Sequence, residues 1–153
     1  MSLTSLADIK AWLFEPSRFA KGASCPCCAQ FVKVYKRGFN RTMGRAIIWI
    51  ANQERGQWVD VARATPKELK SFRDWDKLMF WGLVERRSSD TAAKRASGYW
   101  RATALGLRFA EGKHRIPKYV KVYNGAWQGF EGVSVAITDI VDGFDYGKLM
   151  RGE

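Results

Sequence analysis

The spacing of hydrophobic residues predicts two helices in the first third of the chain. Residues 3–14 have apolar positions at helical spacing, and Pro16 follows, whose ring disfavours a helical conformation in the residue before it. Asn40 is a capping residue type, and after it apolar residues recur from Met43 to Ala51 at the offsets of one helix face. The first helix should therefore end before Pro16, and the second should bury the face that begins at Met43.

The middle of the chain has the clearest signals for element boundaries. Thr65-Pro66-Lys67-Glu68 has the form of a capping box, with Pro at the first helical position and Glu three residues after the Thr. Gly82 follows an apolar periodic segment and is typical of a residue that ends a helix. The expected elements are a strand at 58–61, a short helix at 66–70, a helix at 72–81, strands at 83–87 and 99–103, and a helix at 104–112.

Alternating patterns on either side of this middle part predict further strands. Asn124-Gly125 is a strong signal for a type I′ hairpin turn, and Thr138 and Asp145 are residue types that cap short helical turns. The strand candidates are 31–36, 119–123 and 133–137. We therefore expect an α+β fold that forms a single compact unit. Its segments are an N-terminal helix with a cysteine-containing basic stretch (1–38), a core (39–112) and a β-rich extension packed on the core (113–153).

The order of the middle elements is that of a winged helix-turn-helix: helix, short helix, helix ending in glycine, strand, basic loop, strand. The runs DKLMFWGLVERR (76–87) and GYWRATALGLRF (98–109) resemble the wing region of MarR-type and related winged-helix proteins. In this pattern the glycine lets the helix reverse into a strand, and Thr103 caps the helix after the wing. The resemblance covers residues 66–111, and it implies a winged-helix core. More faintly, the chain is similar to small uncharacterised phage and prophage proteins.

The net charge is strongly positive and unevenly distributed. The chain has 26 Lys and Arg against 15 Asp and Glu, a net charge of +11. Residues 25–63 contain seven basic and two acidic residues, residues 83–121 contain ten and three, and residues 122–153 contain two and five. Such segregation in a folded domain favours a polyanionic partner, because released counterions drive its binding. Nucleic acid, with duplex DNA as the preferred form, is therefore the expected partner.

The candidate phosphate contacts lie in the wing, in the helix before it and in the basic segment 31–45. The resemblance implies that the helix at 72–81 enters a major groove while the wing contacts a minor groove or phosphates. That helix lacks Asn, Gln and Ser to read base edges, and its Asp74 and Asp76 would repel phosphates. The candidate nucleic-acid-binding residues are Lys33, Lys36, Arg37, Arg41, Arg45, Arg73, Lys77, Arg86, Arg87, Lys94, Arg95 and Arg101.

The aromatic residues near these cations have two interpretations. Helical spacing favours core packing for the Trp and Phe residues of this region over base stacking. The alternation of Tyr119, Lys121 and Tyr123 fits a strand face that binds single-stranded nucleic acid, and it fits a half-buried strand equally well. The first group comprises Trp75, Phe80, Trp81 and Trp100.

The cysteines form one cluster, Cys25-Pro26-Cys27-Cys28, which follows a short basic stretch of small residues. Cys25 and Cys28 have the C-x-x-C spacing of a zinc ligand pair, and only Cys27 and His114 remain as sulfur or nitrogen ligands. A zinc site using all four residues is one interpretation, and reduced structural thiols are the favoured one. The cluster does not have the form of a disulfide framework, which fits the cytoplasm.

No catalytic, targeting or membrane segment is predicted. The motifs G-x-S-x-G, Walker A, G-x-G-x-x-G and H-E-x-x-H are absent from the sequence, so we expect no enzyme. The first eight residues lack a basic region and a long apolar run, so no signal peptide is expected, and no apolar stretch is long enough for a membrane span. The expected function is a non-catalytic DNA-binding protein, such as a phage regulator of transcription. The alternative is a protein-interaction module or phage effector that binds a host protein through the winged helix. The sequence does not predict the oligomeric state.

Overall fold

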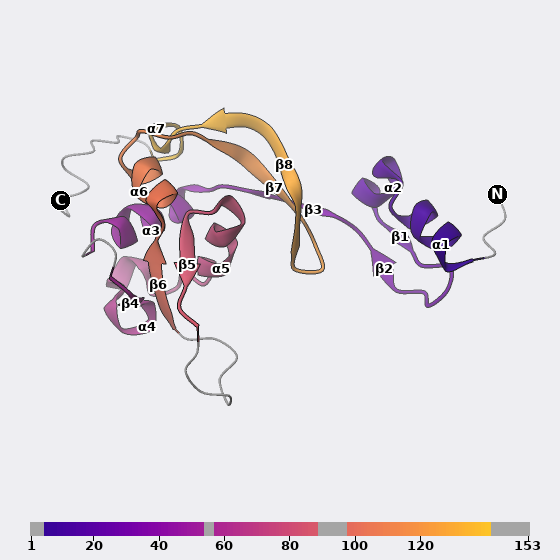
Figure 1. The fold of residues 1–153 in the computed structure, drawn as a ribbon, viewed down its shortest axis with the longest axis horizontal. Helices are drawn as coiled ribbons and strands as arrows, with labels where there is room; N and C mark the ends of the chain where they lie inside the picture. Colours follow the sequence, from indigo (N-terminus) through magenta and orange to yellow (C-terminus); the bar gives the residue numbers. More distant parts are fainter. Residues whose placement is uncertain (1–4, 54–56, 89–97, 142–153) are drawn as a thin grey trace. The chain divides into compact units, whose positions relative to one another are not determined.

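A computed structural model of the chain describes residues 5–53, 57–88 and 98–141, which fall into two compact units (Figure 1). Unit 1 comprises residues 1–38 and 119–131, and unit 2 comprises residues 39–118 and 132–153. The sequence instead predicts one compact unit with three consecutive segments. The expected extension is divided between the units, because its two long strands, β7 (Ile116–Tyr123) and β8 (Ala126–Val135), have residues in both.

Unit 1 begins with two helices, α1 (Leu6–Leu13) and α2 (Pro16–Lys21). Ser5 caps α1 by accepting the Asp8 N–H at 3.1 Å, and the helix ends before Pro16, as predicted. No element was expected in place of α2. It forms because Glu15 is its cap, accepting the N–H groups of Ser17 and Arg18. The Ser17 hydroxyl and the Arg18 and Ser17 amides lower the pKa of the Glu15 carboxyl.

The strands of unit 1 form two antiparallel arrangements. β1 (Ala23–Ser24) pairs with β2 (Phe31–Val32), and β3 (Tyr35–Gly38) pairs with β7 in a sheet of order β3-β7-β8. The strand expected at 31–36 is interrupted because the Val34 N–H donates to the Phe19 carbonyl of α2 instead of to a neighbouring strand. The hairpin turn is as expected, with φ of 51° at Asn124 and 77° at Gly125.

Unit 2 contains the helix α3 (Arg41–Ala51), and the structure confirms the helix predicted after Asn40. Asn40 caps it by accepting the Met43 N–H at 2.9 Å, and the predicted face of Met43, Ile47 and Ile50 is buried. A sheet of order β4-β6-β5 and several short helices complete the unit (Figure 1). In chain order the elements are α3 (Arg41–Ala51), β4 (Val59–Asp60), α4 (Val61–Ala64), the 3₁₀ turn η1 (Lys67–Leu69), α5 (Trp75–Leu78), the 3₁₀ turn η2 (Met79–Trp81), β5 (Val84–Arg86), β6 (Tyr99–Ala102), α6 (Ala104–Ala110) and α7 (Ile137–Ile140).

An aromatic cluster lies at the centre of unit 2. Phe39 is fully buried, with its ring centroid 5.3 Å from that of Trp81 and 5.4 Å from that of Phe109, both edge-on. The Trp81 indole N–H donates to the Pro117 carbonyl at 2.8 Å, so the buried ring has its polar group satisfied. α6 packs closely on the start of β5, since a Cβ at Gly106 would lie 2.0 Å from the Leu83 carbonyl oxygen.

The capping box predicted at Thr65 does not form. The Thr65 hydroxyl instead donates to the Val61 carbonyl at 2.7 Å, which closes the unexpected helix α4, and η1 begins at Lys67 without a side-chain cap. A buried hydroxyl needs a partner, and this carbonyl provides it. The capping box was therefore predicted wrongly.

Two further boundaries differ from the prediction. The helix expected at 72–81 is shortened to α5 and η2, because Asp74 has φ of −93° and ψ of 29°, outside the helical range. The strand expected at 133–137 is instead the end of β8 followed by α7, where the Asp139 carboxylate accepts the Ala136 N–H at 2.8 Å. Asp145 lies outside the described residues. The coarse prediction of an α+β fold is confirmed.

Candidate nucleic-acid interface

The sheet of unit 2 separates a core face from an outer face. Because side chains alternate along a strand, Val84 and Trp100, each 3% exposed, point to the core, while Tyr99, Arg101 and Glu85 point outward and are half-buried. Glu85 lies opposite Arg101 in the β5–β6 register. The outer face is therefore partly exposed and carries charged and aromatic groups together.

Three arginines of this sheet each stack on an aromatic ring. The guanidinium carbon lies 4.2 Å from the Trp100 centroid for Arg86 and 4.1 Å from the Tyr99 centroid for Arg87. For Arg101, the same distance to the Trp58 ring is 4.2 Å. Stacking on a ring restricts the orientation of a guanidinium while its N–H groups at the edge can still donate. These arginines are therefore oriented by the sheet itself.

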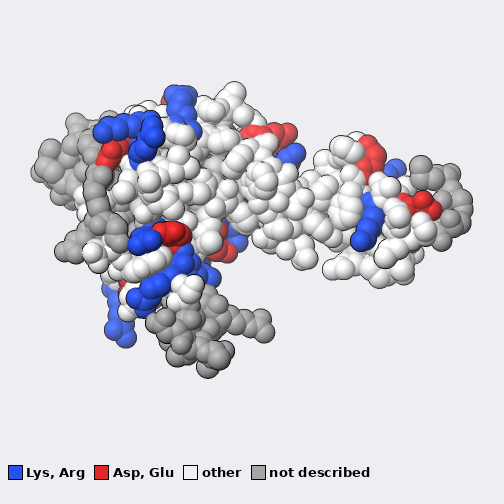
Figure 2. Space-filling model, viewed as in Figure 1, with Lys and Arg blue, Asp and Glu red and all other residues white. Residues whose placement is uncertain are grey.

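The positive charge of the sheet is concentrated where β5 ends. Arg101 forms an ion pair with Glu85, and Asp60 pairs with Arg63 at 3.6 Å, so these charges offset one another. Arg86 and Arg87 follow one another at the end of β5, and the Arg87 N–H extends the ladder by donating to the Tyr99 carbonyl at 3.0 Å. Figure 2 shows Lys and Arg side chains gathered around this sheet on the face in view. Lys94 and Arg95 lie outside the described residues.

The residues around α5 provide little that could read bases. Arg73 donates to the Lys70 carbonyl at 2.6 Å, and Lys77 pairs with Asp76 at 3.0 Å. Exposed groups here include Asp74, Asp76 and Met79. The aromatic residues interpreted as core are buried, except for the half-buried Phe80; the buried ones are Trp75, Trp81 and Trp100.

The remaining candidate cations are divided between the two units. Arg41 and Arg45 are exposed on α3 in unit 2, whereas Lys33, Lys36 and Arg37 belong to unit 1. The sequence suggested one continuous basic segment at 31–45. In the structure this segment is divided between the two units after Gly38.

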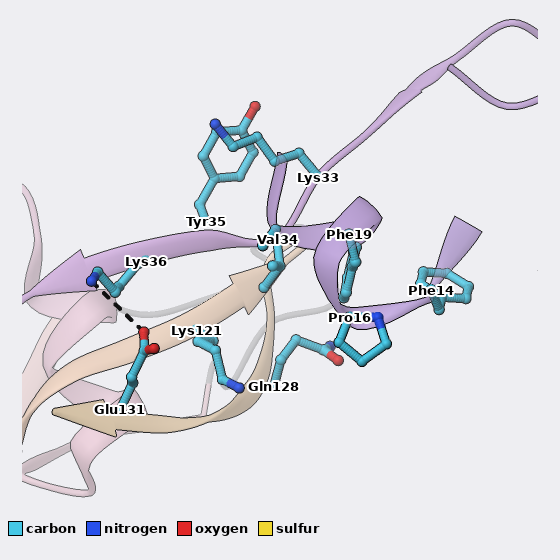
Figure 3. Close-up of a pocket in the computed structure, with 11 residues that line it drawn as sticks. Phe14, Pro16, Phe19, Lys33, Val34, Tyr35, Lys36, Lys121, Gln128 and Glu131 are labelled. Atoms are coloured by element: carbon cyan, nitrogen blue, oxygen red, sulfur yellow. Dashed lines mark ion pairs between the residues drawn. The ribbon is translucent and has the colours of Figure 1, made fainter. Parts of the chain in front are cut away.

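Unit 1 has its own hollow, with a volume of about 740 Å³ (Figure 3). In Figure 3, Phe14, Pro16 and Phe19 lie on one side of it, and Lys121 and Gln128 approach from the strands. Its rim includes Lys33 and also Lys36, which pairs with Glu131 at 3.8 Å. The hollow combines an apolar wall with a mainly positive rim, and it could not be predicted from the sequence because no helix was expected at α2.

Tyr119 and Tyr123 have different environments within unit 1. The ring of Tyr123 packs edge-on against Phe14 at 5.6 Å and Phe19 at 5.2 Å between centroids. Tyr119 lies beneath the Lys36 ammonium, 4.5 Å from the ring centroid. Tyr123 is therefore a packing residue of unit 1, which favours the half-buried strand over a face on which bases stack.

The cysteine cluster forms the turn between β1 and β2. The backbone N–H groups of Cys28 and Cys27 point at the Cys25 sulfur and lower the pKa of its thiol. All three cysteines are free thiols. Within the described ranges, no three His, Cys, Asp or Glu side chains are grouped to hold a metal, and His114 belongs to unit 2. The four-ligand zinc site considered from the sequence therefore stays a prediction.

Sequence reasoning missed Trp58 and Tyr99 as partners of the arginines. The signal was present, since Tyr99 and Arg101 alternate along β6, but the pairs depend on the register between strands.

In the part of the chain that the structure describes, no helix is long and apolar enough to cross a bilayer. Comparisons of the chain with models of protein families, with curated proteins and with solved structures found no match.

Proposed function

We propose that residues 41–110 form a winged-helix module that binds duplex DNA through its phosphates, without catalysis. The observation that carries this proposal is the set of stacked arginines, Arg86, Arg87 and Arg101, on the strands that flank residues 88–98. That segment contains two further cations, Lys94 and Arg95. The winged-helix interpretation is supported by the chain order of α3, β4, α4, α5, β5, β6 and α6 and by the sheet order β4-β6-β5.

Phosphate contact fits these arginines better than base reading. A planar guanidinium donates in a fork that matches two phosphate oxygens, and a stacked one loses little conformational freedom on binding. Phosphate contacts position a protein on DNA but carry no sequence information of their own. The exposed aspartates of the α5 region, Asp74 and Asp76, would repel the phosphates that line a DNA major groove. The proposed binding is accordingly weakly selective for sequence.

The charge of unit 2 agrees with this role. It contains 19 Lys and Arg against 12 Asp and Glu, whereas unit 1 contains seven against three. Both units are therefore positive, and unit 2 holds most of the cations. This activity would fit a cytoplasmic regulator encoded by a phage. The phage origin rests on the sequence resemblance alone.

The test is a titration of labelled duplex with the full chain, followed by fluorescence anisotropy at several salt concentrations. If phosphates are the ligand, log K falls linearly with log salt, with a slope of about −0.9 per phosphate contacted. A matched single-stranded probe of the same length separates duplex from single-strand binding. An affinity that does not change between about 50 and 200 mM salt would contradict the proposal.

A protein-binding role is the second candidate, and the α5 region favours it. Met79 is 45% exposed there, the carboxylates of Asp74 and Asp76 are exposed as well, and Phe72 and Trp75 help to line a cavity of about 460 Å³. A protein partner could use such a mixed acidic and apolar surface. Pull-downs from nuclease-treated lysate should then lose the partner with Asp74→Lys/Asp76→Lys and keep it with Arg86→Glu/Arg87→Glu. The reverse pattern, or the absence of any partner, would rule out the α5 region as a protein-binding surface.

A further inference from the structure

The turn between β1 and β2 contains all three cysteines and is closed by backbone hydrogen bonds. The Cys25 N–H donates to the Gln30 carbonyl at 2.8 Å, and the Ala29 N–H donates to the Cys25 carbonyl, also at 2.8 Å. Ala29 has φ of 64°, a left-handed conformation that lets the chain return into β2. Cys28 is exposed and Cys25 is partly exposed. The backbone therefore fixes both sulfurs at an accessible end of the hairpin.

The two sulfurs are arranged as a pair of metal ligands. The Cys25 sulfur accepts the Cys27 N–H at 3.4 Å and also the Cys28 N–H, so the turn brings the two ends of the C-x-x-C motif together. Amide groups pointing at a sulfur stabilise a thiolate, which is the form that binds metal. Cysteines at the two ends of a C-x-x-C motif are the usual way in which one segment provides two sulfur ligands to a tetrahedral zinc.

In the described residues of one chain, no third ligand is grouped with this pair. A closed zinc site needs four ligands, and the only other sulfur and nitrogen ligands in the sequence are Cys27 and His114. Cys27 uses its amide to bond the Cys25 sulfur and is adjacent to Cys28, which makes it hard for both side chains to reach one metal. The described residues contain no third His, Cys, Asp or Glu grouped with Cys25 and Cys28.

We propose that two copies of this chain share one zinc ion, with Cys25 and Cys28 of each copy as its four ligands. Phe31, next to the turn and 58% exposed, provides apolar surface for the second copy. Unit 1 is positively charged, with seven Lys and Arg against three Asp and Glu, so two copies repel each other without a metal. Four thiolates around zinc carry a net charge of −2, which offsets part of this repulsion. The dimer is therefore metal-dependent.

The inference does not rest on DNA binding, and its test does not use DNA. The reduced, metal-free full chain is titrated with Co²⁺, which reports thiolate ligands through a charge-transfer band in the near ultraviolet. Zn²⁺ is then added as a competitor, and the mass is followed by light scattering during gel filtration. The expected result is saturation at one metal per two chains, the band intensity of four thiolates, displacement by Zn²⁺ and a doubled mass.

Serine variants identify the ligands. Cys25→Ser and Cys28→Ser should each abolish the band and the dimer, while the matched Cys27→Ser should retain both. A serine oxygen at position 25 can still accept the two amide bonds of the turn, and circular dichroism checks that each variant is folded. One metal per monomer, loss of the band in Cys27→Ser or His114→Gln, or no band in the wild type overturns the proposal. So does a metal-independent dimer held by a disulfide, which reducing agent would dissociate.

Discussion

The guanidinium of Arg86 lies over the indole of Trp100, 4.2 Å from the ring centroid, and the two residues are paired across β5 and β6. Trp100 is 3% exposed, whereas Arg86 is exposed. A core residue therefore holds the cation at the end of β5, and the packing of unit 2 is linked directly to the proposed phosphate contact.

Replacing Arg86 should separate the effect of its charge from that of its stacking. Arg86→Lys keeps the charge but loses the planar fork, and an exposed cation–π contact is worth about 0.5–1 kcal/mol. Arg86→Gln loses the charge as well and should flatten the salt slope by about 0.9. Anisotropy titrations should rank duplex affinity as wild type, then Arg86→Lys, then Arg86→Gln. If Arg86→Gln binds duplex with the affinity of the wild type, Arg86 does not contact DNA.

Neutralising Glu85 should strengthen binding. Its carboxylate is paired with Arg101 and would repel a nearby phosphate, so Glu85→Gln should raise duplex affinity and steepen the salt dependence. The stability should change by no more than about 1 kcal/mol, because the pair is partly exposed. Glu68→Gln, an exposed carboxylate on η1, is the matched control and should bind as wild type. Weaker binding in Glu85→Gln would show that the ion pair positions Arg101 for DNA.

A methyl group at Gly106 should destabilise unit 2. The new Cβ would lie 2.0 Å from the Leu83 carbonyl oxygen, so α6 or β5 must move. The expected loss of unfolding free energy is about 1–3 kcal/mol, measured by urea denaturation followed by circular dichroism. Gly98→Ala is the control, because its Cβ would be 3.8 Å from the nearest atom, an Asp60 oxygen. Equal stability of the two variants would contradict the close packing of α6.

Thr103 makes two bonds that a valine cannot replace. Its hydroxyl accepts the Gly106 N–H at 3.0 Å as the cap of α6 and donates to the Gly82 carbonyl at 2.5 Å. Thr103→Val should cost about 1 kcal/mol of unfolding free energy, while Thr103→Ser should retain most of the stability. Thermal unfolding of both variants tests this. A serine variant as unstable as the valine variant would mean that the methyl group, not the hydroxyl, is what matters.

The features that local sequence specifies were predicted well. Asn40, Thr103 and Gly82 act within a few residues of themselves, so their capping and turn roles could be inferred from the sequence, and the structure confirms them. The buried stripe that begins at Met43 depends only on helical spacing, and it is also confirmed.

The features that were missed depend on partners distant in sequence. Val34 donates to Phe19, which ends the expected strand, and the alternation pattern contains no sign of that bond. The stack of Arg101 on Trp58 requires the register of β4 against β6, which sequence spacing does not determine. The Thr65 hydroxyl could bond either the following turn, as a cap, or the preceding one. In the structure it is buried and donates to the Val61 carbonyl of the preceding turn. The candidate cations were thus predicted as residues, but not the aromatic ring on which each of the three sheet arginines stacks.

The most direct test of the central claim is the salt dependence of duplex affinity for the wild type and Arg86→Glu/Arg87→Glu. Lys67→Glu/Arg108→Glu is the control, with the same change in net charge at exposed positions elsewhere in unit 2. We expect a steep salt dependence in the wild type and the control, and loss of most duplex binding in Arg86→Glu/Arg87→Glu. Equal losses in the two double variants, or a wild-type affinity independent of salt, would contradict it.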